Sequence, residues 1–253
     1  METIARGCSE FGWDLKGAAA VDPSVGRRRL GVDKVIVCFS KDAFQRLSKA
    51  FGGGSTKAPA FDGSIEGRLA HGTALYLSSI GAAASAMMLE EMISSGIRRV
   101  LVIGYAGSIS PSVRVGDIVV PTWGIREEGT SYHYFGPEHE AHPSRRLVVE
   151  LERRIDQDEF YEGGVWTTDA VFRETRAKIA RYAKMGVLAI DMECTALMCV
   201  AQYRKVELAA VLAISDELFG EKWVPAFKSR RLGKATEIAC RSARDMFSTR
   251  RGA

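Results

Sequence analysis

Two continuous apolar runs in the last third of the chain, separated by one helix-length segment, limit most strongly what this sequence can fold into. The runs are residues 187–190 and 208–214, and an Ala/Cys/Met-rich stretch from about 194 to 203 lies between them. Runs without polar alternation are typical of parallel strands buried on both faces, and such strands need a helical crossover. The pattern predicts a three-layer α/β/α fold around a central mixed, largely parallel β-sheet.

The same alternation recurs along the chain. Further strands are expected at 35–39, 74–80, 99–103, 118–121 and 165–169, and helices at 41–51, 82–95, 143–157, 174–184 and 232–247. The strand at 118–121 is expected to end at its proline. Residues 1–30 lack periodicity and are predicted to form an N-terminal extension of uncertain order, followed by a single domain over residues 31–253.

Composition argues against several classes of protein. The balance of 35 basic and 31 acidic residues gives a net charge of +4, which is too small for a nucleic-acid surface without a concentrated patch. No apolar run reaches the length of a membrane span, and acidic and basic residues interrupt the N-terminus where a signal sequence would be apolar. The five cysteines lack metal-ligand spacing. We expect a cytoplasmic protein that binds no nucleic acid, membrane or metal.

Three carboxylates follow the two apolar runs. Asp191 and Glu193 come after the first run, and Asp216, preceded by Ser215, comes after the second. Ligands of parallel sheets bind outside the carboxyl ends of the strands, so these acids are expected to share one crevice. Helix capping is the simpler role for Asp191 alone, whereas Glu193 lies in an apolar turn where a carboxylate needs a partner.

Three motifs in the same order resemble the nucleoside phosphorylase and nucleosidase family. They are Met192-Glu193 with the later Ser215-Asp216, the segment 104–108 (Gly-Tyr-Ala-Gly-Ser) followed by 115–120 (Val-Gly-Asp-Ile-Val-Val), and 126–133 (Arg-Glu-Glu-Gly-Thr-Ser-Tyr-His). The resemblance covers roughly residues 72–220. It implies a phosphorylase/hydrolase-like fold, a homo-oligomer between a dimer and a hexamer, and cleavage of the N-glycosidic bond of a nucleoside. It implies no cofactor, with phosphate as co-substrate.

The resemblance also implies roles for residues around the sugar. Glu193 is expected to accept hydrogen bonds from the ribose hydroxyls, Met192 to pack against the sugar, and Asp191 to belong to the same subsite. The dipole of the following helix favours the ionised form of Glu193, which is the form that accepts two hydroxyls.

At the base, the resemblance assigns Asp216 as the acid that protonates the leaving group, with Ser215 beside it. Trp166 occupies the place of an aromatic residue that stacks on the base, although filling the core explains it nearly as well. Asp216 favours a purine. Residues 172–176 lie where pyrimidine-specific members bind uracil, but their register does not match, so the base stays open.

The phosphate site departs from the family pattern. Val102 and Tyr105 occupy the places of an arginine and a serine or threonine, and residues 40–42 replace a glycine-proline-arginine loop. Arg126 is the first candidate to bind phosphate, assisted by Tyr105 and by amides at the helix start after Gly81. The glycine at position 81 equally suits close packing of helix on strand. Other candidates are Lys228, Arg230 or an arginine of a neighbouring subunit.

Three functions therefore remain open. A phosphorylase is favoured, because a nucleosidase would carry a second acid just after the first strand and residues 38–40 contain none. The alternatives are a nucleosidase that uses water and a catalytically silent nucleoside-binding protein. The polar stretch 221–231, interrupted by Pro225, is predicted to be a lid over the site.

Overall fold

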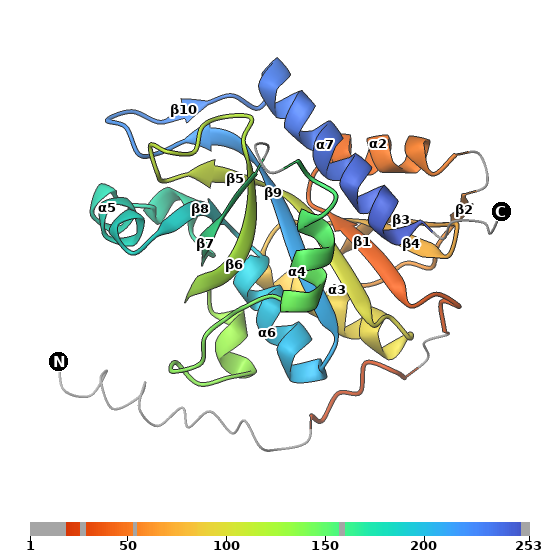
Figure 1. The fold of residues 1–253 in the computed structure, drawn as a ribbon. Coiled ribbons are helices and arrows are strands. Elements are labelled where there is room, and N and C mark those ends of the chain that lie inside the picture. Colours follow the sequence, from red (N-terminus) through yellow and green to blue (C-terminus); the bar gives the residue numbers. More distant parts are fainter. Residues whose placement is uncertain (1–18, 26–28, 53–54, 157–159, 249–253) are drawn as a thin grey trace.

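The computed structural model describes residues 19–25, 29–52, 55–156 and 160–248. Most of the predicted N-terminal extension lies outside these ranges, so the division of the chain at residue 31 stays a prediction. The described parts form layers of helices around a strongly twisted sheet (Figure 1).

Ten strands of the described chain form a single mixed sheet in the order β10-β9-β6-β7-β8-β5-β1-β4-β3-β2. Their bounds are β1 Lys34–Cys38, β2 Thr56–Lys57, β3 Ser64–Ala70, β4 Thr73–Ser78, β5 Arg99–Ser108, β6 Ile118–Glu127, β7 Phe160–Thr168, β8 Val187–Asp191, β9 Glu207–Glu217 and β10 Val224–Pro225. The strands β4, β1, β5 and β9 pair in parallel, as do β6, β7 and β8. Because β9 also pairs with β5, the strands β5, β8, β7, β6 and β9 close into a ring.

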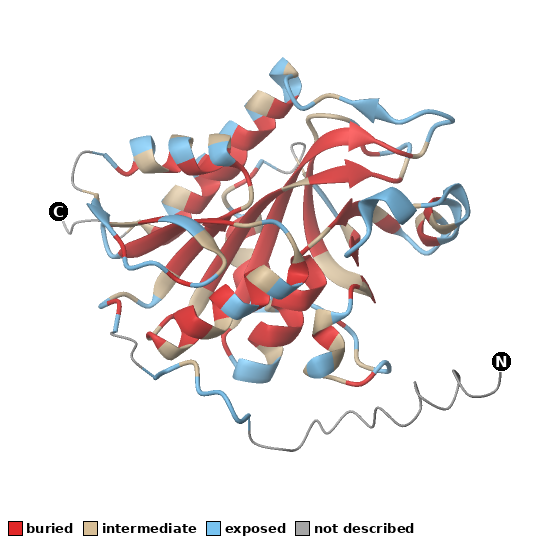
Figure 2. Cartoon of the chain, turned by 180° about the vertical axis from the view of Figure 1, so that it is seen from behind, coloured by how far each residue is buried: buried red, intermediate tan, exposed pale blue. Residues whose placement is uncertain are grey.

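Helices cover both faces of this sheet, as the sequence predicts. Their bounds are α2 Lys41–Ala50, α3 Ala82–Ser94, α4 Arg145–Glu152, α5 Arg176–Lys184, α6 Cys194–Arg204 and α7 Arg230–Phe247, with short 3₁₀ helices η1 Thr130–His133 and η3 Val171–Arg173. Side chains alternate along β1: Val35 and Val37 join one hydrophobic cluster with α3 and α6, whereas Ile36 and Cys38 join another with α2, α4 and α7. Figure 2 shows the buried strands between these helices. The prediction of a three-layer α/β/α fold is confirmed.

Two strands are longer than the sequence indicated. β6 does not end at Pro121 but continues to Glu127, and its register with β7 shifts between Pro121 and Trp123. β5 likewise continues past the predicted end at residue 103 to Ser108, and its register with β9 shifts between Ala106 and Gly107. Such irregularities bend a strand without ending it, so these positions curve the sheet toward its closed ring.

The strand β3 is not among those predicted from the sequence. Its residues include Glu66 and Arg68, and it pairs antiparallel with β4 near one edge of the sheet. A partly exposed strand lacks the continuous apolar run of a central strand. The predicted helix 143–157 is also shorter in the structure, spanning Arg145–Glu152. No helix in the described part of the chain is long and apolar enough to cross a membrane.

Candidate active site

A cavity of about 520 Å³ lies at the carboxyl ends of β5, β8 and β9. The three strand ends meet there because Gly107 of β5 pairs with Asp216 of β9 and with Ile190 of β8. A Cβ atom on Gly107 would lie 2.3 Å from Leu218 Cδ1 and 3.2 Å from Asp216 Oδ2. The absence of a side chain at Gly107 therefore lets β5 pass close to this acid.

The structure brings most of the predicted site residues into the lining of this cavity. The predicted residues among the lining are Tyr105, Asp191, Met192, Glu193, Ser215 and Asp216. The remaining lining residues are Phe39, Ile80, Ala106, Gly107, Val171, Phe172, Glu174, Arg176, Ile179, Ile190, Leu218, Trp223 and Phe227. Trp166, Arg126 and Gly81 do not belong to the lining.

Asp191 caps the helix that follows it. Its Oδ2 accepts hydrogen bonds from the amides of Glu193 at 3.2 Å and Cys194 at 2.8 Å, and its Oδ1 accepts one from Thr167 Oγ1 at 2.6 Å. Burial raises the pKa of Asp191, and these hydrogen bonds oppose that shift. Both oxygens are engaged by the protein, so the expected contact of Asp191 with ribose is replaced by a structural role at the start of α6.

Glu193 lies next to this cap and is only 6 % exposed. Its Oε1 accepts a hydrogen bond of 2.7 Å from the amide of Gly81, at the start of α3. Burial and the neighbouring charge of Asp191 raise the pKa of Glu193 to about 8. This upward shift opposes the helix dipole, which favours the ionised form of Glu193. The dipole contributes about 1 kcal/mol or less at an exposed terminus, and desolvation outweighs it here.

Gly81 has a conformational reason to be glycine. Its φ is +113°, a region that other residues rarely adopt, and an added Cβ would meet nothing within 4 Å. Close packing does not require a glycine at this position. With this positive φ, the amide of Gly81 donates its hydrogen bond to Glu193.

Asp216 is buried at the end of β9 and accepts two side-chain hydrogen bonds. Ser215 Oγ donates to its Oδ1 at 2.6 Å, and Trp223 Nε1 donates to its Oδ2 at 2.7 Å. Trp223 belongs to the predicted lid, in which β10 pairs antiparallel with β9 and places Pro225 opposite Asp216. The predicted lid segment therefore contacts the acid that the sequence assigned to the leaving base.

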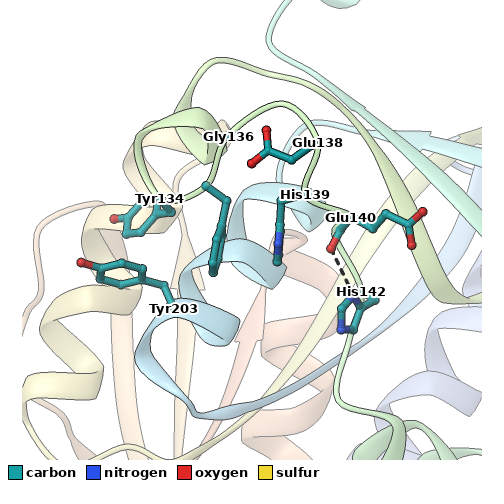
Figure 3. Close-up of a pocket in the computed structure, with 8 residues that line it drawn as sticks. Tyr134, Gly136, Glu138, His139, Glu140, His142 and Tyr203 are labelled. Carbon is teal, nitrogen blue, oxygen red and sulfur yellow. Dashed lines mark hydrogen bonds between the residues drawn. The ribbon is translucent and has the colours of Figure 1, made fainter. Parts of the chain in front are cut away.

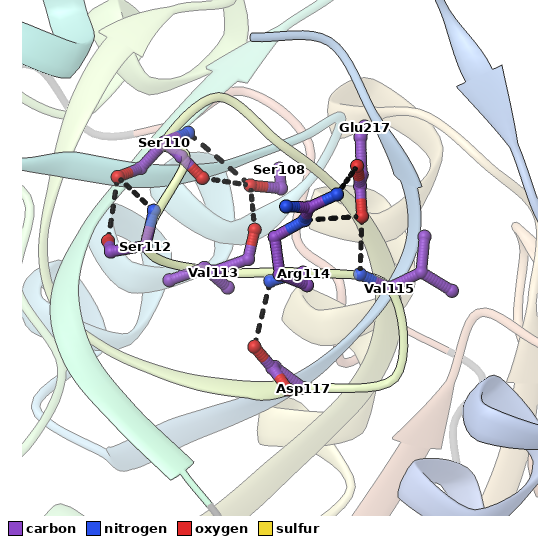
Figure 4. Close-up of polar contacts among 8 residues, drawn as sticks. All are labelled: Ser108, Ser110, Ser112, Val113, Arg114, Val115, Asp117 and Glu217. Carbon is purple, nitrogen blue, oxygen red and sulfur yellow. Dashed lines mark hydrogen bonds and ion pairs between the residues drawn. The ribbon is translucent and has the colours of Figure 1, made fainter. Parts of the chain in front are cut away.

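An ion pair holds the residue after Asp216 (Figure 4). Arg114 donates from Nε and Nη2 to the two carboxylate oxygens of Glu217, at 2.9 and 3.0 Å, and the amide of Val115 donates to the same side chain at 3.0 Å. These contacts lower the pKa of Glu217, mainly through the hydrogen bonds from Arg114. They fix the end of β9, so the position of Asp216 does not depend on a flexible loop.

Glu174 and Arg176 line the cavity, although the sequence assigned them no role. Arg176 donates from Nη1 to the carbonyls of Leu218 and, at 2.5 Å, Gly220, and from Nη2 to that of Glu221 at 2.9 Å. Burial and the charge of Asp216 raise the pKa of Glu174 to about 7. The available signal was that residues 172–176 occupy a base-binding region in relatives, but their register did not match.

Trp166 has a different role from the one expected. It is fully buried, its Nε1 donates to Glu127 Oε2 at 2.9 Å, and its ring packs edge-on against Tyr182 at 4.8 Å between centroids. It therefore fills the core beneath the site and does not present a face to the cavity. This corrects its assignment to base stacking and favours the core-filling alternative.

The guanidinium of Arg126 forms its hydrogen bonds outside the cavity. Its guanidinium donates to Ser131 Oγ at 2.8 Å and to the carbonyls of Phe135, Gly136 and His139 at 2.8, 2.7 and 2.9 Å. All these contacts lie within the segment 129–140, away from the cavity described above. The assignment of Arg126 to the phosphate site is therefore corrected, because its guanidinium hydrogen-bonds the loop 129–140.

That loop forms one side of a second hollow, also of about 520 Å³ (Figure 3). The lining residues of this hollow are Tyr134, Phe135, Gly136, Glu138, His139, Glu140, His142 and Tyr203. The rings of Phe135 and His139 stack with centroids 3.7 Å apart. The two hollows have the same volume, so size does not identify the active site. Their lining residues do, because none of the predicted site residues lines the second hollow.

Comparison with known proteins identifies the family. A model of the phosphorylase superfamily matches residues 33–247, which is most of the chain. The chain belongs to this superfamily. The relatives to which it is similar are named as purine, guanosine and uridine phosphorylases.

Individual relatives of this phosphorylase-superfamily protein are distant. It is 28 % identical to a guanosine phosphorylase of Halorubrum lacusprofundi over 151 residues, which are 58 % of this chain and just under two thirds, 63 %, of that enzyme. It is 27 % identical to a DeoD-type purine nucleoside phosphorylase of Bacillus cereus over 192 residues, or 72 % of this chain and 79 % of the relative. A crystal structure of uridine phosphorylase from Vibrio fischeri superposes with a TM-score of 0.73 at 21 % identity, covering 87 % of this chain and 98 % of the other. The structural similarity establishes the shared fold.

Proposed function

We propose that this protein is a pentosyltransferase that cleaves the N-glycosidic bond of a ribonucleoside with phosphate, releasing the base and ribose 1-phosphate. The observation that carries the proposal is the meeting of Glu193 and Asp216 in one cavity at the ends of β8 and β9. The relatives named above are phosphorylases of guanosine, purine nucleosides and uridine, which supports the reaction type but leaves the base open.

Glu193 suits the ribose subsite because its carboxyl group is buried and one oxygen is already held by the protein. Gly81 donates to its Oε1 at 2.7 Å, and Oε2 is the second acceptor of this carboxylate. A ribose hydroxyl can bond to that second oxygen. Met192, which is half-buried in the same lining, provides an apolar surface for the sugar ring.

Asp216 suits the base subsite. Its two oxygens accept from Ser215 and Trp223, so its orientation is fixed while it faces the cavity. Cleavage of the glycosidic bond leaves negative charge on the base, and a positioned acid lowers the barrier by hydrogen bonding or protonation. A purine can take that proton on a ring nitrogen.

Binding of phosphate requires positively charged side chains, and the described cavity lining contains only one, which is already bonded to the protein. Arg176 is the only basic residue in that lining, and its guanidinium bonds three carbonyls. We propose that Lys228 and Arg230 neutralise phosphate together with a basic side chain of a neighbouring subunit. Both residues are exposed and follow Phe227, which lines the cavity.

A nucleoside panel with and without phosphate tests the reaction, with the sugar product identified. Ribose 1-phosphate that forms only in the presence of phosphate supports the proposal. The double variant Lys228→Gln/Arg230→Gln should then raise the phosphate KM more than the nucleoside KM. Lys234→Gln, an exposed lysine further along α7, serves as the control.

Hydrolysis is the second candidate, and the acidic character of the cavity favours it. Four carboxylates and one engaged arginine line the described cavity, and water needs no charge compensation. Free ribose formed at the same rate with and without phosphate would establish this reaction. Binding without release of base under either condition would instead identify a nucleoside-binding protein, detectable as a nucleoside-dependent rise in Tm.

A further inference from the structure

Glu128 is a buried carboxylate directly after β6, and it is only 1 % exposed. Its Oε2 accepts a hydrogen bond of 2.9 Å from the amide of Ser131, in η1. Its Oε1 accepts one of 3.0 Å from Thr195 Oγ1, in the first turn of α6. Each oxygen bonds to a different element, so this one side chain joins the end of β6 to both η1 and α6.

A carboxylate at the depth of Glu128 needs partners, because removing a charge from water is costly unless hydrogen bonds replace its hydration. Arg126 extends the network, since its Nε donates to Ser131 Oγ at 2.8 Å. A buried network in which each member is hydrogen-bonded holds its members in one arrangement. Apolar side chains often fill such a place at no loss of stability. The presence of an acid here therefore indicates a geometric role.

Thr195, the partner of Glu128 on α6, is held from two further directions. Its amide donates to Thr167 Oγ1 of β7 at 3.0 Å. Its methyl group packs against β6, where a Cβ on Gly124 would lie 2.4 Å from Thr195 Cγ2. Gly124 has no room for a side chain, so β6 passes directly beside the start of α6. These contacts hold the hydroxyl of Thr195 toward Glu128.

The first turn of α6 also carries Glu193, which is the N-cap residue of the helix. Other side chains accept hydrogen bonds from the first amides, those of residues 193–195. The carboxylate of Glu193 is therefore not needed for capping, and it accepts from the amide of Gly81 at 2.7 Å while it lines the cavity. The position of this carboxylate depends on where the first turn of α6 is held.

We propose that Glu128 is a positioning residue for the ribose subsite, which it affects by holding the first turn of α6 through Thr195; this inference rests on the proposed function. Glu128 is not among the residues that line the described cavity, so its effect on a sugar passes through the helix. Hydrogen bonds from ribose hydroxyls to Glu193 depend steeply on distance and angle. A small displacement of this turn therefore weakens them.

Variants of Thr195 test this role without changing Glu128 or Glu193. Thr195→Val removes the hydroxyl and keeps the shape of the side chain, whereas Thr195→Ser keeps the hydroxyl. Thr73→Val is the matched control: Thr73 is as fully buried as Thr195, and its hydroxyl donates to the carbonyl of Phe247 at 2.9 Å. Neither Thr73 nor Phe247 lines the described cavity.

Hydrogen exchange measures how firmly the first turn of α6 is held, whether or not a nucleoside binds. Amides of residues 192–197 should exchange faster in Thr195→Val than in Thr73→Val by about tenfold or more, because a hydrogen bond to a charged group is lost. Thr195→Ser should stay close to the wild type. Thr195→Ala leaves space for water beside Glu128 and is expected to behave as Thr195→Val does, should the latter fail to fold.

Calorimetric titration with inosine, uridine and their 2′-deoxy counterparts then measures the sugar contact. The preference for the ribonucleoside, as a ratio of Kd values, should fall several-fold in Thr195→Val and persist in Thr195→Ser and Thr73→Val. Faster exchange in Thr195→Val without nucleoside binding by the wild type would support the contact of Glu128 with α6 and reject the proposed function instead. Unchanged exchange in Thr195→Val, or an equal loss of preference in Thr73→Val, would overturn the inference.

Discussion

At the scale of single residues, Asp191 and Glu193 show how neighbouring acids acquire different roles. Both are buried, at 7 % and 6 % exposure, and both lie at the start of α6. Asp191 accepts hydrogen bonds at both carboxylate oxygens, whereas Glu193 accepts one from Gly81 at Oε1. Burial therefore dominates at Glu193 and raises its pKa to about 8, which leaves it available to a ligand.

The raised pKa of Glu193 predicts a particular dependence of stability on pH. Between its ordinary value of 4.5 and about 8, the folded protein retains a proton that the unfolded chain has released. Stability contributed by this group falls as pH rises through that window, by up to about 1.4 kcal/mol per pH unit. Glu193→Gln removes this loss. The difference in Tm, variant minus wild type, should therefore become more positive as the pH rises from 5 to about 8.

Denaturation of both proteins across this pH range checks the prediction, and the same variant should lose ribonucleoside turnover. The acids Asp191 and Glu174 face the same cavity and are present in both proteins. A margin in Tm that does not vary with pH would show that Glu193 does not titrate in this window.

Asp216 leads to a prediction about the leaving group. Asp216→Asn keeps an acceptor and a side chain of the same size but cannot transfer a proton. Turnover of purine nucleosides should fall by about a hundredfold or more, and compounds with an activated leaving group should lose much less. Trp223→Phe is the control, because it removes the indole donor to Asp216 and keeps the acid. Equal losses for both substrate types would assign Asp216 a positioning role.

At the scale of elements, the segments around the site are held by arginines that bond backbone carbonyls. Arg176 fastens the η3–α5 segment to the chain after β9, and Arg126 holds the segment 129–140 after β6. A guanidinium carries five donors, so a single side chain can satisfy several carbonyls that no regular element pairs. These arginines therefore support the loops and do not bind an anion.

Arg126→Met tests that conclusion. It leaves Ser131 and the carbonyls of Phe135, Gly136 and His139 without their donor. The free energy of unfolding should fall by about 3 kcal/mol, because buried acceptors lose hydrogen bonds to a charged group. The KM for phosphate should change no more than the KM for nucleoside.

The matched control for this measurement is Arg68→Met. Arg68 forms an exposed ion pair with Glu66 at 2.8 Å, with side-chain exposures of 40 % and 43 %, and its loss should cost at most about 1 kcal/mol. A selective rise in the phosphate KM of Arg126→Met, with unchanged stability, would restore Arg126 to the phosphate site.

At the scale of the whole molecule, exposed apolar side chains gather at the mouth of the cavity. Ile80, Phe172, Trp223 and Phe227 line it and are each more than half exposed. Patches of this kind mark interaction surfaces. We therefore expect a homo-oligomer in which a neighbouring subunit borders the cavity, which would also supply the basic side chain that phosphate requires.

Light scattering of the purified chain measures this directly. The mass should be a multiple of 27.7 kDa between a dimer and a hexamer. Phe172→Asp, at a residue that is 97 % exposed on the rim, should lower the mass, whereas Val21→Asp, at a residue 81 % exposed outside the cavity lining, should not. A monomeric mass for the wild type would contradict the expectation.

The sequence by itself determined the layered fold, because continuous apolar runs and the helices between them are local patterns. Such runs are buried as parallel strands with helices on both faces of the sheet. It also placed Glu193 and Asp216 at strand ends, since an acid directly after such a run lies at the carboxyl edge of the sheet. Motif order was enough to indicate the family.

Only the tertiary structure decided which polar residues face the cavity. Arg126 and Trp166 carry the same local signals as site residues, but their partners, Gly136 and Glu127 among others, depend on how β6 bends and how the ring of strands closes. Glu174 lacks a local signal because its position depends on Arg176 bonding to carbonyls more than forty residues away. Hydrogen bonding and desolvation depend on contacts made across the chain, and residue order alone does not specify them.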